Sequence, residues 1–285
     1  MMMFKTGILL DSLRTDLDDA LAFAAETGVS GVQIYASPHE MSSMKIDLQE
    51  AEILKKKVQR YGLELSALCG DLGGHGFERE DENPEKIVKT KKIIDFAVEL
   101  GIRIITTHIG VVSETDAEHN TVMQDALRKI CSYAQRAGVF IAVETGPERS
   151  EVLKKFIVET GERNLKVNFD PANLVMVQGE DPAEAVRILR DYIVYTHAKD
   201  GRMVKKCNPE EIYGAFADGN PAGINFDDYF VELPLGRGDV NFPEYLKTLD
   251  DIGYTGYLTI EREAGDRRKK DVVEGISFLE KITGI

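Results

Sequence analysis

Eight short apolar runs, separated by longer segments with helical periodicity, are the feature that most constrains how this 285-residue chain folds. The runs are rich in Val, Ile and Leu and do not alternate polar with apolar residues, which is typical of strands buried on both faces. They lie at residues 6–10, 31–35, 63–69, 103–109, 139–144, 165–170, 192–197 and 257–261. A strand–helix alternation repeated eight times predicts an α/β protein, a (β/α)8 TIM barrel. A doubly wound open sheet is the alternative, but no G-x-G-x-x-G follows the first run.

The segments between the runs have the apolar spacing and the stop signals of amphipathic helices. Residues 85–100 and 271–282 each place apolar side chains near one helix face. These are Ile87, Val88, Ile94, Ala97 and Val98 in the first segment, and Val272, Ile276, Leu279 and Ile282 in the second. Glycines that tolerate the left-handed turn at a helix end precede several runs. They are Gly28, Gly62, Gly101, Gly138, Gly161 and Gly253.

The spacing of the last two runs indicates an insertion. No stretch rich in Pro, Gly or Ser divides the chain, so we expect a single domain over residues 1–285. The residues that end the last two runs, His197 and Glu261, are 64 positions apart, and the excess length lies at residues 200–242. A long loop before the eighth strand is typical of a lid or binding loop, and a short helical excursion without function is the alternative.

The charge balance and the cysteines limit the partners and the compartment. The chain carries 35 basic and 49 acidic side chains, a net charge of −14, which argues against nucleic acid or an anionic membrane as a partner. The first apolar run stops at Asp11, too early for a signal peptide, and no stretch approaches the length of a transmembrane helix. Cys69, Cys131 and Cys207 show no C-x-x-C spacing. We therefore expect free thiols and a cytoplasmic protein.

Titratable side chains end five successive runs: His108, Glu144, Asp170, His197 and Glu261. In a barrel these positions meet at the carboxyl ends of the strands, where active sites form. Three converging carboxylates would repel one another, and a divalent cation would resolve that repulsion. The last four residues offer three oxygens and one nitrogen without thiolate, which favours Mn²⁺, with Mg²⁺, Co²⁺ or Zn²⁺ as alternatives. Any one of them alone could instead be an ordinary structural residue.

Five motifs carry a resemblance to a known family. They are V-E-T at 143–145, N-F-D-P-A-N at 168–173, H-A-K-D at 197–200, L-G-R-G-D-V-N-F at 235–242 and G-Y-L-T-I-E at 256–261. The chain thereby resembles the sugar phosphate isomerase/epimerase family of xylose isomerase-like, AP endonuclease family 2 TIM barrels. The resemblance implies that Glu144, Asp170, His197 and Glu261 hold one divalent metal ion. It also implies that Glu144 and Glu261 form an acid–base pair, and it allows a homo-oligomer.

Departures from the family pattern narrow the function. Asn173 stands where the apurinic-site endonucleases and several ketose 3-epimerases have a histidine, and the stretch Asp239-Val240-Asn241 lacks a second endonuclease histidine. Together with the net charge, this disfavours DNA cleavage. Met203 replaces an arginine of the 3-epimerases, so we expect Lys199 and Asp200 to supply polar contacts instead.

These observations predict a divalent-metal-dependent isomerase or epimerase of a sugar or keto-sugar. The reaction would be proton transfer next to a carbonyl through an enediolate. An inosose- or dehydroshikimate-type dehydratase and a non-catalytic sugar-binding barrel are the alternatives. The expected substrate contacts are His108, Asn173, Lys199, Arg237, Tyr35 and Cys69. Arg237 would bind an anionic group such as phosphate, whereas His108 has a core histidine as its alternative.

Overall fold

A closed barrel of eight parallel strands forms the centre of the computed structural model, which describes residues 4–36 and 48–284. The strands follow the order β1-β10-β7-β6-β5-β4-β3-β2 around the barrel. They are β1 (Lys5–Leu9), β2 (Gly31–Tyr35), β3 (Glu64–Cys69), β4 (Ile104–Thr107), β5 (Phe140–Glu144), β6 (Leu165–Phe169), β7 (Ile193–Ala198) and β10 (Tyr257–Ile260). Each lies within one of the eight predicted runs or differs from it at the ends by one or two residues. The predicted TIM barrel is therefore confirmed, and the open sheet is excluded.

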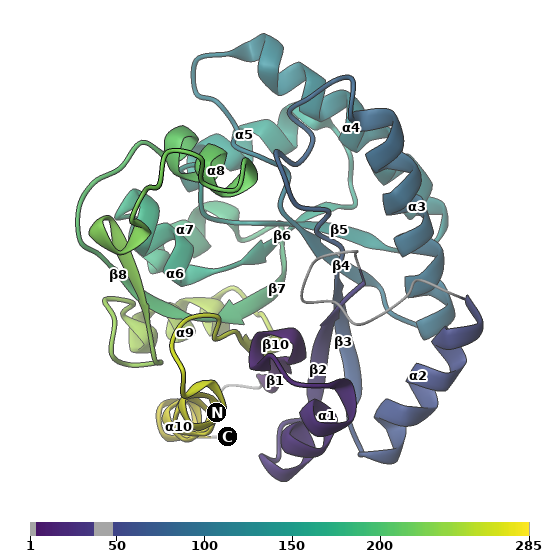
Figure 1. The fold of residues 1–285 in the computed structure, drawn as a ribbon, viewed down its shortest axis with the longest axis vertical. Coiled ribbons are helices and arrows are strands. Elements are labelled where there is room, and N and C mark those ends of the chain that lie inside the picture. The colour runs from purple at the N-terminus through teal and green to yellow at the C-terminus, as the bar shows by residue number, and fades with distance from the viewer. Residues whose placement is uncertain (1–3, 37–47, 285) are drawn as a thin grey trace.

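Helices surround the barrel on its outside (Figure 1). They are α1 (Leu17–Glu26), α2 (Leu48–Arg60), α3 (Asn83–Leu100), α4 (Ala117–Arg136), α5 (Ser150–Thr160), α7 (Pro182–Leu189), α9 (Phe242–Asp251) and α10 (Arg268–Thr283). Asp16, Asp116 and Asp181 accept backbone N–H groups at the starts of α1, α4 and α7. The six predicted stop glycines all have φ between 70° and 79°, as a left-handed helix end requires.

The buried faces of two helices test the predicted apolar faces. On α10, Val272, Ile276 and Leu279 are buried as predicted, and Ile282 packs partly buried against the core. On α3, the prediction is wrong for Val88 and Val98, whose exposed fractions are 54% and 45%. The buried face of α3 is therefore narrower than predicted.

The insertion before the last strand consists of regular elements. These are β8 (Asp200–Met203), α8 (Pro209–Ala217), the 3-10 turn η3 (Phe226–Asp228) and β9 (Phe230–Leu233). Strands β8 and β9 pair antiparallel, from Asp200 with Leu233 to Met203 with Phe230. They pack against the short helix α6 (Pro171–Asn173) and the π-helical turn η2 (Leu174–Gln178), which follow β6 (Figure 1). The insertion therefore joins the end of the barrel where β6 and β7 finish.

Two further expectations concern the whole chain. Cys69, Cys131 and Cys207 are all free thiols, as predicted. Among the residues that the structure describes, none of the helices is long and apolar enough to cross a bilayer.

Candidate active site

A pocket of about 610 Å³ lies at the carboxyl ends of the barrel strands. Its lining includes Glu144 and Glu261 from the barrel and Tyr213, Phe216 and Phe226 from the insertion. The volume falls within the range of about 300–1,000 Å³ that is common for small-molecule sites. The pocket therefore joins the strand ends that the sequence predicted as the site to the insertion that it predicted as a lid or binding loop.

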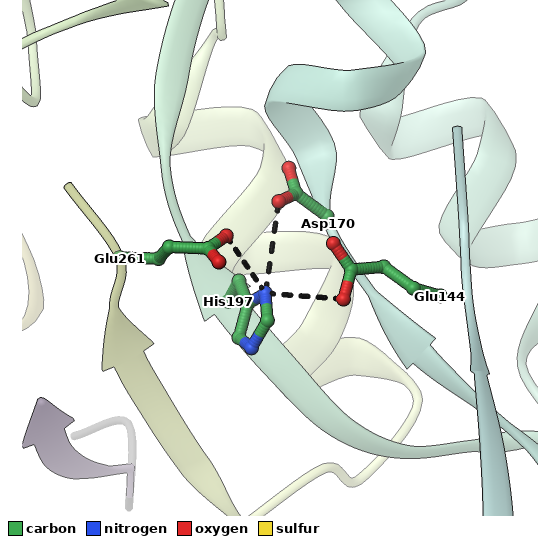
Figure 2. A group of neighbouring side chains, drawn as sticks. All are labelled: Glu144, Asp170, His197 and Glu261. Carbon is green, nitrogen blue, oxygen red and sulfur yellow. Dashed lines mark ion pairs between the residues drawn. The ribbon is translucent and has the colours of Figure 1, made fainter. Parts of the chain in front are cut away.

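Glu144, Asp170, His197 and Glu261 meet at the inner end of this pocket. Each offers one ligand atom, and these four atoms all lie within 4.8 Å of one another. The Nδ1 atom of His197 is 3.2 Å from Glu261 Oε2 and 3.7 Å from both Glu144 Oε2 and Asp170 Oδ2. Figure 2 shows the three carboxylates approaching this nitrogen from different sides. The structure thus brings together the four residues that the sequence singled out.

The carboxylate of Asp170 tests whether this cluster suits a metal ion. Its Oδ1 atom accepts the backbone N–H groups of Ala172 and Asn173 and so begins α6. Its Oδ2 atom is buried and has no hydrogen-bond partner among the described residues, and burial raises the pKa of the carboxyl. A buried oxygen without a donor is expected where a cation is the intended partner. The cluster fits a divalent ion by geometry and by donor type.

A chain of hydrogen bonds across the barrel fixes the orientation of the His197 ring. Its Nε2 atom lies 2.9 Å from the side-chain oxygen of Gln33, which can only accept a hydrogen bond. The amide nitrogen of Gln33 donates to the hydroxyl of Thr106 at 2.8 Å, which in turn donates to the backbone oxygen of Leu68. The Gln33 oxygen therefore keeps a proton on Nε2, and Nδ1 is the ring atom that faces the carboxylates and would ligate an ion in place of its proton.

The electrostatics of the cluster call for positive charge. Burial alone would raise the pKa of Glu144, but the charges of His108 and His197 outweigh burial and lower it. Lys199 and His197 lower the pKa of Glu261 against the same burial. Burial alone would lower the pKa of His197, but Glu261 and Glu144 raise it well above its ordinary value. The two glutamates are thus held ionised by the neighbouring cations, and the ionised form is the one that can ligate a metal ion.

Three of the predicted substrate contacts stand beside the two glutamates. Asn173 donates to Glu144 Oε1 at 3.1 Å. Lys199 is buried, and its Nζ atom bridges Glu261 at 3.0 Å and Glu263 at 2.8 Å. His108 is 3.5 Å from Glu144. All three line the pocket, so each is within reach of a ligand there.

The surroundings of His108 exclude a plain core role for this residue. Its Nδ1 atom is 3.3 Å from Asp71, and its side chain keeps 37% of its surface exposed at the pocket. Burial opposes its charged form, but Glu144 and Asp71 raise its pKa to about 10. His108 is therefore a hydrogen-bond donor at neutral pH.

The other predicted contacts differ in placement. Tyr35 lines the pocket, whereas Cys69 packs beside Tyr35 and Leu9 and is not among the pocket-lining residues. Arg237 is exposed and is not among the pocket-lining residues, so its anion contact stays a prediction without support from the pocket. Arg14 is the arginine that lines the pocket instead.

Asp200 also differs from the prediction, because its carboxylate binds the chain itself. It accepts backbone N–H groups from Gly201, Gly236, Gly238 and Val240 at 2.8–3.2 Å. A side chain on Gly238 would begin only 2.1 Å from Asp200 Oδ1, so only glycine allows this approach. The glycines around Arg237 therefore serve to wrap the loop around a buried carboxylate.

Several residues of the pocket were not predicted. Asp71, His75 and Glu78 follow β3, and Glu232 and Glu263 lie on β9 and just after β10. The glycine-rich stretch at 70–76 and the position of Glu263 two residues after Glu261 were the available signals. No signal in the sequence pointed to Gln33, because its contact with His197 depends on which side of β2 faces the barrel interior.

The comparisons with known proteins agree with this architecture. The model of the xylose isomerase-like TIM barrel family matches residues 21–282. A xylose isomerase domain protein of Planctomyces limnophilus is 26% identical, with a TM-score of 0.78 and coverage of 100% of this chain and 99% of that one.

Curated relatives match over part of their length. An uncharacterised protein of Methanocaldococcus jannaschii is 25% identical over 66% of this chain and 59% of its own length. An inosose dehydratase of Clostridium perfringens is 28% identical over 50% of this chain and 46% of its own. The matches thus span about half to three-fifths of these two relatives. With the family model covering most of the chain, this protein belongs to the xylose isomerase-like TIM barrel family.

Proposed function

We propose that this protein is a divalent-metal-dependent isomerase or epimerase of a sugar or keto-sugar, acting by proton transfer at the carbon next to a carbonyl. One observation carries the proposal: two ionised glutamates, Glu144 and Glu261, face the same buried nitrogen of His197 from different sides (Figure 2). A substrate carbon placed between them would have a carboxylate on each face. That arrangement suits removal of a proton from one face and its return to the other.

The four clustered residues would hold the ion, for which we propose Mn²⁺. A bound divalent ion supplies Lewis acidity toward the carbonyl and hydroxyl oxygens of a substrate. Glu144 and Glu261 take and return the proton. Lys199 holds Glu261 in place through its 3.0 Å contact, and His108 offers a hydrogen bond to a substrate oxygen.

A dehydratase is the second candidate, and the relative named inosose dehydratase favours it. The first step would be the same proton abstraction, followed by loss of a hydroxyl from the next carbon. The two reactions share their catalytic residues and differ in whether water leaves.

Deuterium uptake separates these functions. The Mn²⁺-loaded protein is incubated in D₂O with a panel of ketoses, keto-sugars and keto-inositols, and each is followed by NMR and by ultraviolet absorbance. We expect deuterium at the carbon next to the carbonyl without formation of an absorbing enone. Glu144→Gln and Glu261→Gln should each slow the uptake about 100-fold or more. Glu99→Gln, a change at an exposed position of α3, is the matched control.

The metal content of each variant is measured in parallel, so that loss of the base is distinguished from loss of the ion. Formation of an absorbing enone would contradict the isomerase and support the dehydratase. Sugar binding without any exchange would make the protein a non-catalytic sugar-binding barrel.

A further inference from the structure

Three aromatic side chains of the insertion form a row along the pocket. Tyr213 and Phe216 of α8 meet edge to face, with ring centres 6.4 Å apart. Phe216 stacks on Phe226 of η3 at 3.9 Å, with only 10° between the rings. All three line the pocket. We call Tyr213, Phe216 and Phe226 the aromatic row.

The inner end of the aromatic row lies beside the proposed acid–base pair. A side chain on Gly146 would begin 2.9 Å from the Tyr213 hydroxyl and 2.8 Å from Cβ of Asn173, so Tyr213 and Asn173 flank the same backbone position. Asn173 in turn donates to Glu144. The row therefore starts one side chain away from Glu144 and continues through Phe216 to Phe226.

Phe216 leaves much apolar surface uncovered at the pocket. Its exposed fraction is 52%, and it is the one aromatic residue among the exposed large apolar side chains that the structure describes. The others do not line the pocket: Ile53, Val88, Val98, Val158, Val204 and Val273. Phe226 supports the Phe216 ring on one face. Open aromatic surface inside a pocket is typical of a ligand site, because covering it removes apolar area from water.

The size of the pocket points the same way. A single pyranose ring held at Glu144 and Glu261 is smaller than the drug-sized ligands that pockets of this volume, about 610 Å³, accommodate. Space therefore remains beyond the reacting ring, in a pocket that the aromatic row also lines.

We propose that the aromatic row is an aglycone subsite and that the substrate is a glycoside whose reacting ring carries a keto group. The reacting sugar ring lies between Glu144 and Glu261, and a second ring, attached through the glycosidic oxygen, stacks on Phe216. The proposal rests on the proposed function only in placing the reacting ring. An aryl group and a second sugar both present a flat apolar face, and the experiment distinguishes them.

The test compares glycosides that differ only in the aglycone. Calorimetry on the Mn²⁺-loaded protein measures the affinity of the methyl and phenyl glycosides of glucose, galactose, mannose and xylose, and of the disaccharides in which C1 of each sugar is linked to O4 of glucose, in both anomers where they exist. These probes lack the keto group and therefore report binding without reaction. We expect at least one phenyl glycoside or disaccharide to bind about tenfold more tightly than its methyl partner. The better of the two identifies the aglycone. If no ring-bearing derivative exceeds its methyl partner, the subsite is wrong.

Variants assign that preference to the row. Phe216→Ala should bring the ratio of the two affinities, ring-bearing derivative over methyl derivative, close to one. Phe216→Leu should retain part of this preference because apolar area remains. Val158→Ala removes a similarly exposed apolar group from α5 and should leave the affinity ratio unchanged. Mn²⁺ affinity is measured in each variant to show that the barrel is folded. A ratio that survives Phe216→Ala in folded protein would place the aglycone elsewhere and overturn the proposal.

Deuterium uptake separates this inference from the proposed function. If a small keto-sugar exchanges in both wild type and Phe216→Ala but no aglycone preference exists, only the subsite fails. If the preference exists but no substrate exchanges, the subsite stands and the proposed function fails.

Discussion

Single buried side chains decide what the centre around His197 can bind. Gln33 accepts from Nε2 of His197, and Thr106 holds the Gln33 amide in the orientation that makes this possible. The Nδ1 atom is thereby directed at the carboxylates. Partners behind the ligands commonly change metal affinity 10- to 100-fold, because they fix both the tautomer and the angle of the ring.

Gln33→Met tests this series of hydrogen bonds, because methionine has a side chain of similar length but lacks the oxygen that accepts from His197. We expect the Mn²⁺ dissociation constant to rise about 10- to 100-fold, since the ring can then rotate or change tautomer. Calorimetric titration measures it. Gln59→Met, on the exposed face of α2, should leave it unchanged. Equal Mn²⁺ affinities in Gln33→Met and wild type would show that these hydrogen bonds do not position His197.

Glu148 gives the fold a dependence on pH that is separate from the centre. It is buried, and burial raises its pKa to about 8. Between the unfolded pKa near 4.5 and this value, the folded chain holds a proton that the unfolded chain has lost. The stability linked to Glu148 is therefore present at low pH and is lost as the pH rises to about 8.

Glu148→Gln removes this dependence. The free energy of unfolding of wild type should fall relative to the variant by up to about 1.4 kcal/mol per pH unit between pH 5 and 8. Urea unfolding at four pH values measures the difference. A difference that stays constant across this range would mean that Glu148 ionises normally in the folded protein.

Residues at strand ends could be predicted, and residues within strands could not. Glu144, Asp170, His197 and Glu261 each follow an apolar run, and barrel closure requires such positions to meet. Gln33 lies within β2, and its partner Thr106 is 73 residues away, so only the register between strands reveals the pair. The glycines around Arg237 show the same difficulty, because in sequence a loop that wraps a buried carboxylate resembles a loop that binds an anion.

Among the elements, the insertion depends on the loop around Asp200. This carboxylate lies where β8 begins and binds the loop that leads from β9 to α9. It accepts backbone N–H groups on both of its oxygens. Asp200 therefore fixes both ends of the segment that carries the aromatic row.

Asp200→Asn places an amide NH₂ against N–H groups that need an acceptor. We expect the free energy of unfolding to fall by about 2 kcal/mol or more, because hydrogen bonds to a charged group are lost and donors remain unpaired. Cleavage by protease at residues 234–242 should become faster. Urea unfolding and limited proteolysis measure both effects, with the exposed change Asp191→Asn as the control. Unchanged stability and cleavage would contradict the anchoring role.

Elements with a strong period were predictable, and short elements were not. The barrel strands read as continuous apolar runs because both of their faces are buried. Strands β8 and β9 have four residues each and pair across the insertion, so nothing local distinguishes them from loop. The expected long loop before the last strand was therefore correct in position but is built of a helix, a turn and a strand pair.

The molecule as a whole is what makes the centre possible. Glu144 and Glu261 are far apart in the chain, and the circle of eight strands brings β5 and β10 to face the same nitrogen of β7. The distribution of the acidic side chains also depends on the closed barrel. The chain carries a formal charge of −14, and three of its carboxylates converge where a cation would convert repulsion into binding.

A titration of Mn²⁺ into the metal-free protein, compared with Asp170→Asn, tests the proposed centre most directly. Asparagine keeps the acceptor that begins α6 and replaces only the oxygen that has no donor among the described residues. Wild type should bind one ion per chain, and the variant should bind it at least about 100-fold more weakly, a larger loss than a partner behind a ligand causes. Asp191→Asn should bind as wild type. Failure of wild type to bind any divalent ion, or equal binding by Asp170→Asn, would contradict the proposed centre.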